Sequence, residues 1–120
     1  MIQFENKYDL EERTTKFSGN LIIFCKSCAK DIITIPIINQ LIRSGTSIGA
    51  NYQEANGASS KKDFQNKIFI CKKESKETLY WLELIQKTIN EKQKQDGEEL
   101  RQEAKELMLI FSKIASSTKN

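Results

Sequence analysis

Residues 64–89 read FQNKIFICKKESKETLYWLELIQKTI, and their spacing decides the fold. Apolar or small side chains recur there at alternating steps of four and three, the seam of a helix that packs against other helices. Three further segments repeat this spacing. The seam positions are Leu10, Thr14, Phe17, Leu21, Phe24 and Cys28; Ile38, Leu41, Gly45, Ile48, Tyr52 and Ala55; Phe64, Ile68, Cys71, Ser75, Thr78, Leu82, Ile85 and Ile89; and Leu100, Ala104, Leu107, Phe111 and Ile114.

Short breaks separate the seams. Pro36 suits the first turn of a helix, Asn56-Gly57 suits a helix end, and Ser60 suits an N-cap. Acidic residues beside Gly97 favour a further helix start. The expected helices span about 8–31, 36–56, 60–92 and 97–116. Four amphipathic helices joined by short connections predict an all-α, antiparallel up-and-down four-helix bundle, formed by one domain over residues 1–120.

Composition excludes several classes of function. The chain is 38% hydrophobic and 29% charged, and no apolar run approaches the roughly 20 residues of a membrane-spanning helix. The first residues lack the apolar core of a signal peptide, so we expect a cytoplasmic protein with no membrane partner. Histidine is absent, which removes Ser-His-Asp and Cys-His catalysis and His-ligated metals. We therefore expect no enzymatic activity and no cofactor.

The cysteines form one motif that resembles a redox or zinc site. Cys25 and Cys28 are spaced as CxxC, but both lie late in a predicted helix rather than at a helix start. The third thiol, Cys71, is far away in sequence, and a zinc site would need a second ligand pair. The sequence predicts reduced, metal-free cysteines in or near the core.

The third predicted helix carries apolar side chains beyond its seam. At roughly 100° per residue they fall on nearly the opposite side of the helix, with Phe69 beside them. This face predicts self-association, because Trp and Tyr are common interface anchors. The alternative is that the N-terminal segment or the C-terminal tail folds over the face, with Ile2 and Phe4 as the only other apolar residues available to cover it. The interface candidates are Ile70, Tyr80, Trp81 and Leu84.

Basic residues are concentrated on the same helix. Residues 61–76 contain six lysines against Asp63 and Glu74, a net charge of +4, although the whole chain carries only +3. Five of the lysines fall within about a third of the helix circumference, flanked by Phe69 and Tyr80. Such a stripe suits phosphate binding with aromatic stacking, and the alternative is an ordinary solvated face. The nucleic-acid candidates are Lys61, Lys62, Lys72, Lys73 and Lys76.

A polar stripe follows one side of the second predicted helix. It predicts a buried or half-buried network that fixes helix register, with an anion or RNA contact at Arg43 as the alternative. Catalysis has little support, because Glu54 lies two turns or more from Arg43. The stripe comprises Arg43, Ser47, Asn51 and Glu54, with Gln40 and Ser44 beside them.

Residues 40–55, QLIRSGTSIGANYQEA, together with 60–64 and 77–82, resemble the four-helix-bundle proteins encoded in intervening sequences of bacterial 23S ribosomal RNA. The family motif matches Arg43, Ser47, Ile48, Asn51 and Glu54. It departs where the family commonly has a second basic residue and a glycine, because Ile42 and Ala55 stand there. This departure weakens an RNA-contact role for the stripe.

The resemblance implies a bacterial bundle of unassigned activity. Related accessory proteins of diversity-generating retroelements form five-subunit rings that bind nucleic acid. We therefore expect a non-enzymatic homo-oligomer, a pentameric ring by resemblance, with RNA or a ribonucleoprotein as a possible partner. The net charge of only +3 agrees less well with strong RNA binding. The alternative is a protein-interaction scaffold with no nucleic-acid role.

Overall fold

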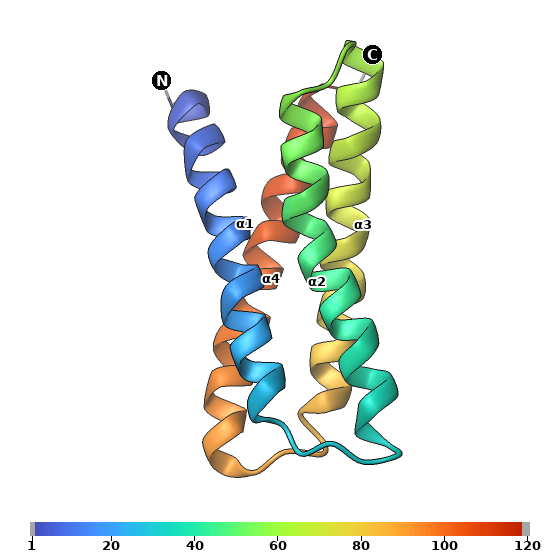
Figure 1. Cartoon of the computed structure of the whole chain (residues 1–120). Coiled ribbons are helices and arrows are strands. Elements are labelled where there is room, and N and C mark those ends of the chain that lie inside the picture. Colours follow the sequence, from blue (N-terminus) through green and yellow to red (C-terminus); the bar gives the residue numbers. More distant parts are fainter. Residues whose placement is uncertain (1, 119–120) are drawn as a thin grey trace.

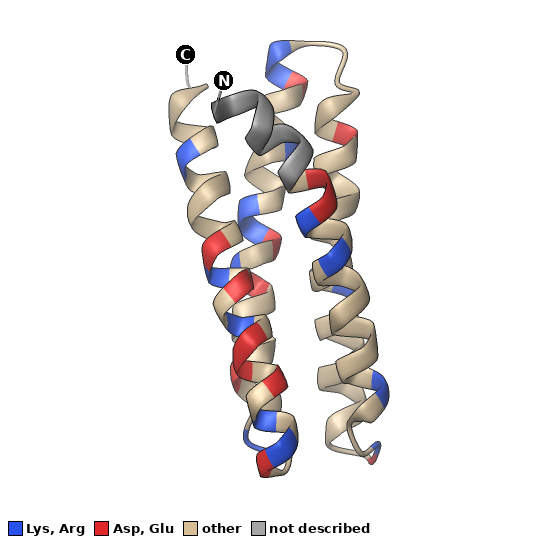
Figure 2. Ribbon diagram, turned by 90° about the vertical axis from the view of Figure 1, so that its left-hand side faces the viewer, with Lys and Arg blue, Asp and Glu red and all other residues tan. Residues whose placement is uncertain are grey.

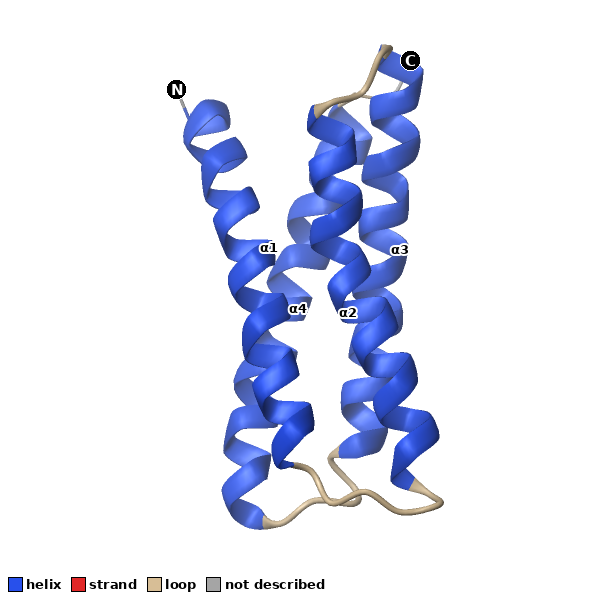
Figure 3. Cartoon of the chain, in the orientation of Figure 1, coloured by secondary structure: helices blue, strands red, loops and turns tan. Residues whose placement is uncertain are grey.

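A computed structural model describes the backbone of residues 2–118 and the side chains of residues 10–118. Its helices are α1 (Ile2–Ser27), α2 (Thr34–Asn56), α3 (Lys61–Ile85) and α4 (Glu91–Ser117). They run alternately up and down (Figure 1), and the described chain contains no strand (Figure 3). The α2–α3 connection lies at one end and the other two connections lie at the opposite end. The predicted all-α antiparallel four-helix bundle is confirmed.

Each helix packs against its neighbours in the chain, and α4 returns to α1. The α2–α3 contact is the most extensive of the four in the described residues, and the α1–α4 contact is the least extensive. Among these residues, no helix is long and apolar enough to cross a bilayer.

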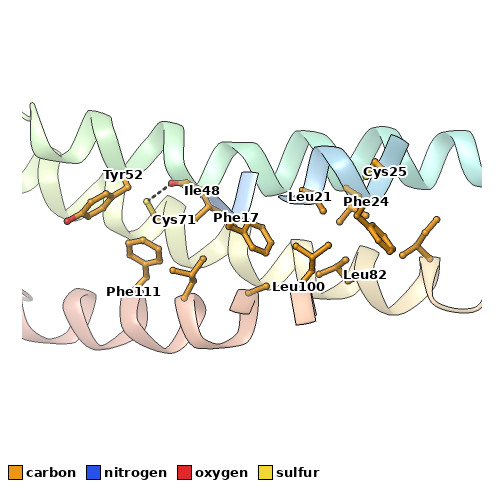
Figure 4. Packing of buried hydrophobic residues seen from close by; sticks show 14 of the residues in the cluster. Phe17, Leu21, Phe24, Cys25, Ile48, Tyr52, Cys71, Leu82, Leu100 and Phe111 are labelled. Atoms are coloured by element: carbon orange, nitrogen blue, oxygen red, sulfur yellow. Dashed lines mark hydrogen bonds between the residues drawn. The ribbon is translucent and has the colours of Figure 1, made fainter. Parts of the chain in front are cut away.

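The predicted seams form the core. Every seam position of α1 and α2 is buried, as are six of α3 and four of α4. Phe64, Ile89 and Ile114 are half-buried and pack against this core. Aromatic rings fill its centre (Figure 4), where the ring centroids of Tyr52 and Phe111 lie 5.7 Å apart. Helical spacing therefore predicted the core correctly.

Small residues allow α2 to approach its neighbours closely. A Cβ atom added at Gly45 would lie 2.1 Å from Cδ2 of Leu21, and one at Gly49 would lie 3.2 Å from Cβ of Thr14. Toward α3, the buried hydroxyl of Thr78 lies 3.0 Å from that of Ser44. These small and hydroxyl side chains therefore let the backbone of α2 lie close to both α1 and α3.

The α1–α2 connection is fixed by side-chain hydrogen bonds. The ammonium group of Lys30 donates to the carbonyl oxygens of Cys25, Lys26 and Cys28 at 2.8–3.0 Å, which caps α1 at Ser27 instead of the predicted residue 31. The α2 helix begins at Thr34, two residues before the prediction, so that Pro36 still lies in its first turn.

The predicted boundary between the last two helices is wrong. The α3 helix ends at Ile85 rather than residue 92, and α4 begins at Glu91 rather than residue 97. Asn90 is the N-cap, because its side chain accepts from the Gln93 backbone at 2.9 Å while the Gln93 side chain accepts from the Asn90 backbone at 3.3 Å. Gly97 is buried inside α4, where an added Cβ would lie 2.3 Å from Oε1 of Gln86.

We predict opposite effects of alanine at two glycines. Gly45→Ala should lower the free energy of unfolding by about 1–2 kcal/mol, because the methyl group would displace the buried Leu21 side chain by more than the helix-propensity gain offsets. Gly19→Ala should raise it by about 0.5–1 kcal/mol, since nothing lies within 4 Å of the new Cβ atom. Urea unfolding followed by circular dichroism measures both changes, and a stabilising Gly45→Ala would contradict the packing argument.

Candidate nucleic-acid interface

The lysine face of α3 points to solvent, as the spacing predicted. Four of its five lysines are exposed and Lys72 is half-buried. Phe69 and Tyr80 lie on the same side of the helix and expose 57% and 55% of their surface. The lysine face, as we call it, comprises Lys61, Lys62, Lys72, Lys73 and Lys76 with these two aromatic rings.

The charge of the lysine face is not neutralised by neighbouring carboxylates. The ion pairs among the described residues use Arg13, Arg43, Lys67, Lys94 and Arg101, and none involves the five lysines. An unpaired lysine can meet a phosphate without first breaking an ion pair, and each contact releases counterions from the nucleic acid. The face is therefore available to a polyanion.

Two acidic residues of α3, Glu74 and Glu77, are directed toward α2. Arg43 forms ion pairs with Glu77 and, at 3.5 Å, with Glu74. The Trp81 indole N–H donates to the same Glu77 carboxylate at 3.0 Å. Together the hydrogen bonds from Trp81 and Arg43 lower the pKa of Glu77, and Lys73 adds a smaller electrostatic effect. This arrangement directs these two carboxylates away from most of the lysine face, whereas Glu83 of the same helix remains exposed.

The polar stripe of α2 divides into parts that do not meet. Arg43 also donates to Gln40 at 3.1 Å, whereas Glu54 forms an ion pair with Lys67 of α3 at 2.7 Å. Between these two ends, the side chains of Ser47 and Asn51 donate to carbonyl oxygens of their own helix at 2.7 and 2.9 Å. The stripe thus joins α2 to α3 at two places, which favours the structural reading over an RNA contact at Arg43.

The predicted second apolar face of α3 is only partly exposed. Trp81 is half-buried and packs against the core. The Tyr80 ring is edge-on to the Trp81 ring, with the two ring centroids 5.0 Å apart. Ile70 and Leu84 are half-buried, so that only Tyr80 among the four interface candidates is exposed. The expectation that a single bundle leaves all four in water was wrong. The alternative cover by Ile2 and Phe4 concerns side chains outside the described residues.

The three thiols lie in the core. Burial raises the pKa of Cys25 and Cys71 to about 12 and also raises that of Cys28. The Cys71 thiol donates to the carbonyl oxygen of Ile48 at 3.5 Å (Figure 4). No three Cys, Asp or Glu side chains converge as a metal site in the described part of the chain. The predicted core position of the cysteines is confirmed.

A groove of about 640 Å³ separates α1 from α4. Its floor includes Phe17, Phe24 and Leu100, and its walls carry charges of both signs. Arg13 closes part of it through ion pairs with Glu103 at 2.8 Å and Glu106 at 3.1 Å, on the acidic side of α4 that Figure 2 shows beside α1. Carboxylates on one wall make this groove a poor site for nucleic acid.

The sequence reasoning missed a group of exposed isoleucines at the end that carries the α1–α2 connection. The expectation that Ile2 and Phe4 are the only other apolar residues available outside the seams was therefore wrong. The available signal was the absence of charge from residues 17–25 and 32–42, in a chain that is 29% charged. The isoleucine end, as we call it, comprises Ile22, Ile23, Ile32, Ile33 and Ile35.

Fold and surface define a small helical-bundle protein with a cationic, aromatic outer face. The chain belongs to the 23S rRNA-intervening sequence protein family, whose model matches residues 6–113. It is similar to a Bacteroides thetaiotaomicron protein of unknown function from the S23 ribosomal protein family, solved as a crystal structure. The two share 33% identity and a TM-score of 0.76, over 88% of this chain and 97% of the other. No curated protein matches the sequence.

We predict a pH-dependent effect of Glu77→Gln. The folded protein lowers the pKa of Glu77, so its charge stabilises the fold above the unfolded-state pKa and this contribution disappears as the pH falls through the folded-state value. The variant should be about 0.5–1 kcal/mol less stable at pH 7, a modest effect because the pair is partly exposed. Urea unfolding at pH 7 and below about pH 4 tests this.

The matched control is Glu83→Gln, an exposed carboxylate of the same helix that takes part in no ion pair among the described residues. A Glu77→Gln deficit that persists unchanged in acid would contradict the ion-pair explanation.

We also predict slow thiol labelling in the native protein. Thiolate is the reactive form, and burial holds Cys25, Cys28 and Cys71 protonated at pH 8. A chromogenic disulfide reagent should therefore label almost none of them within minutes, and all three promptly in denaturant. Fast reaction of the folded chain, or a stoichiometric zinc signal in elemental analysis, would overturn the assignment as metal-free core thiols.

Proposed function

We propose that this protein is a non-enzymatic, self-associating bundle that binds structured RNA, or an RNA within a ribonucleoprotein, through the lysine face of α3. The observation that carries this proposal is a row of five lysines without ion-pair partners among the described residues, interleaved with exposed Phe69 and Tyr80. Lysines bind the phosphate backbone with little sequence preference, and the rings can stack on unpaired bases.

Self-association strengthens such binding. One lysine face neutralises few phosphates, so a single chain of net charge +3 should bind weakly. An oligomer repeats the face, and linked sites raise the apparent affinity without any new type of contact. A ring of five subunits is the arrangement that the family resemblance suggests, and the family name itself refers to 23S rRNA.

A protein-interaction scaffold is the second candidate function. The isoleucine end favours it, because exposed apolar side chains bind protein surfaces rather than phosphates. The two functions differ in the role of the lysine face. RNA binding requires those charges, whereas the scaffold leaves them as a solvated surface.

We predict salt-dependent RNA binding that is lost with the lysines. Replacing Lys72, Lys73 and Lys76 with glutamine removes three charges and preserves helix propensity. The log–log dependence of affinity on salt should become shallower by about 0.7–0.9 per lost phosphate contact. Fluorescence anisotropy of a labelled structured RNA, titrated at several salt concentrations, measures affinity and slope together.

A matched control removes the same charge from another helix. Lys92, Lys105 and Lys113 are exposed on α4 and take part in no ion pair among the described residues. Their triple glutamine variant should keep most of the affinity. The RNA proposal fails if the parent shows no binding near 50 mM salt, or if both triple variants lose affinity equally; the scaffold is then the better account.

A further inference from the structure

Two exposed aromatic rings lie in line along α3. Phe69 and Tyr80 are the two large apolar side chains that this helix exposes, at 57% and 55% of their surface. Tyr80 follows Phe69 by eleven positions, which is three helical turns plus about 20°. Both rings therefore point in nearly the same direction, about 16 Å apart along the helix axis. Single exposed apolar residues are ordinary, but two aligned rings form a surface of defined spacing.

Lysines occupy the interval between the two rings. Starting from Phe69, steps of four, three and four residues lead through two lysines to Tyr80, and a further lysine lies seven residues before Phe69. These three lysines are exposed and take part in no ion pair among the described residues. Cations and rings thus alternate along one side of the helix. The aromatic line, as we call it, comprises Lys62, Phe69, Lys73, Lys76 and Tyr80.

The Tyr80 ring is restrained by its neighbour. Trp81 packs against the core, and its indole N–H donates to the Glu77 carboxylate at 3.0 Å. The Tyr80 ring contacts this fixed indole edge-on, with the two centroids 5.0 Å apart, and still exposes more than half of its surface. A restrained ring loses little conformational entropy when a ligand stacks on it.

Unpaired bases suit the aromatic line better than paired bases do. In a double helix of RNA the bases stack on one another, and the outside presents phosphates, sugars and base edges. Lysines can bind those phosphates, but the two rings meet no base face and contribute little. In an unpaired segment the base faces are free to stack on aromatic side chains, while the phosphates of the same strand bind lysines. Both kinds of side chain on the line are then used.

We propose that the RNA element bound by the lysine face is an unpaired segment, such as a hairpin loop or a single-stranded end, in preference to a duplex. Bases of this segment stack on Phe69 and Tyr80, and its phosphates bind Lys73 and Lys76 in the interval between the rings. This inference rests on RNA binding by the lysine face in the proposed function, and it adds the class of RNA that is bound.

Affinity for two matched RNAs tests the preference. The first probe is a labelled single strand of about 16 nucleotides without self-complementarity, and the second is the same strand annealed to its complement. Near 50 mM salt, the parent should bind the single strand at least about tenfold more tightly in fluorescence anisotropy, although the duplex carries more charge. Equal affinity, or tighter binding of the duplex, overturns the inference.

Removing the rings should abolish the preference. Phe69→Leu/Tyr80→Leu keeps an apolar, helix-favouring side chain at both exposed positions, so the helical circular dichroism signal should be retained. Its affinity for the single strand should fall at least about tenfold, while its affinity for the duplex stays unchanged. The matched control, Phe69→Tyr/Tyr80→Phe, keeps both rings and should bind like the parent. A ring-free variant that binds the single strand as the parent does contradicts stacking.

Trp81 gives a second readout in the unmodified protein. It is the single tryptophan of the chain, and its ring contacts that of Tyr80. A base that stacks on Tyr80 should therefore lower the Trp81 fluorescence, whereas a duplex bound through lysines alone should leave it unchanged. Unchanged emission at saturation with the single strand overturns stacking at Tyr80.

The outcomes separate this inference from the proposed function. A parent that binds neither RNA, or binds both as tightly after Lys72, Lys73 and Lys76 are replaced with glutamine, overturns the proposed function and this inference with it. A parent that loses affinity with the lysines, but binds both RNAs equally and is unaffected by Phe69→Leu/Tyr80→Leu, overturns only the inference. The lysine face then binds RNA by charge alone.

Discussion

The close approach of α2 to its two neighbours is the constraint on which the rest of the structure depends. Gly45 and Gly49 bring α2 near α1, and the hydroxyl pair of Ser44 and Thr78 brings it near α3. Any larger side chain at these positions would push the helices apart and open the aromatic core between them. Because the α2–α3 contact is so extensive, the direction of every side chain on the outer half of α3 follows from it.

One result of this geometry is the separation of charge on α3. Arg43 forms ion pairs with Glu74 and Glu77 and so holds these carboxylates on the side of α3 that faces α2. The ion pair of Glu54 with Lys67 holds that lysine on the same side of α3. Most of the lysine face lies to one side of these carboxylates, and only the charge of Lys73 still acts on Glu77. The polar stripe therefore contributes to the candidate RNA surface indirectly. It does not supply the charge of the surface, but it pairs Glu74 and Glu77, two acids that would otherwise cancel part of that charge.

Helical periodicity was sufficient to predict the core and the outward direction of the lysine face, because both depend only on the angle between residues along a helix. The start of α4 depends on a reciprocal pair of hydrogen bonds between Asn90 and Gln93. The sequence pattern of Asp96 and Gly97 also resembles a helix start, and it led to a predicted start that is too late. Trp81 was misplaced because a large side chain at the flank of a helix can reach the core. The exposure of Ile32 and Ile33 could not be predicted from helical spacing, because it arises from the turn that the hydrogen bonds of Asp31 and Thr34 stabilise.

The weak α1–α4 contact also bears on how the bundle forms and opens. Among the described residues, three of the four helix contacts join neighbours in the chain and close short loops. The contact of α4 with α1 closes nearly the whole chain and is the least extensive of the four. A hairpin of α2 and α3 can therefore form first, with α1 and α4 added to its sides. In the folded protein we expect the side of the bundle between α1 and α4 to have the lowest local stability, so that backbone amides of these two helices exchange with solvent through partial openings that leave α2 and α3 intact.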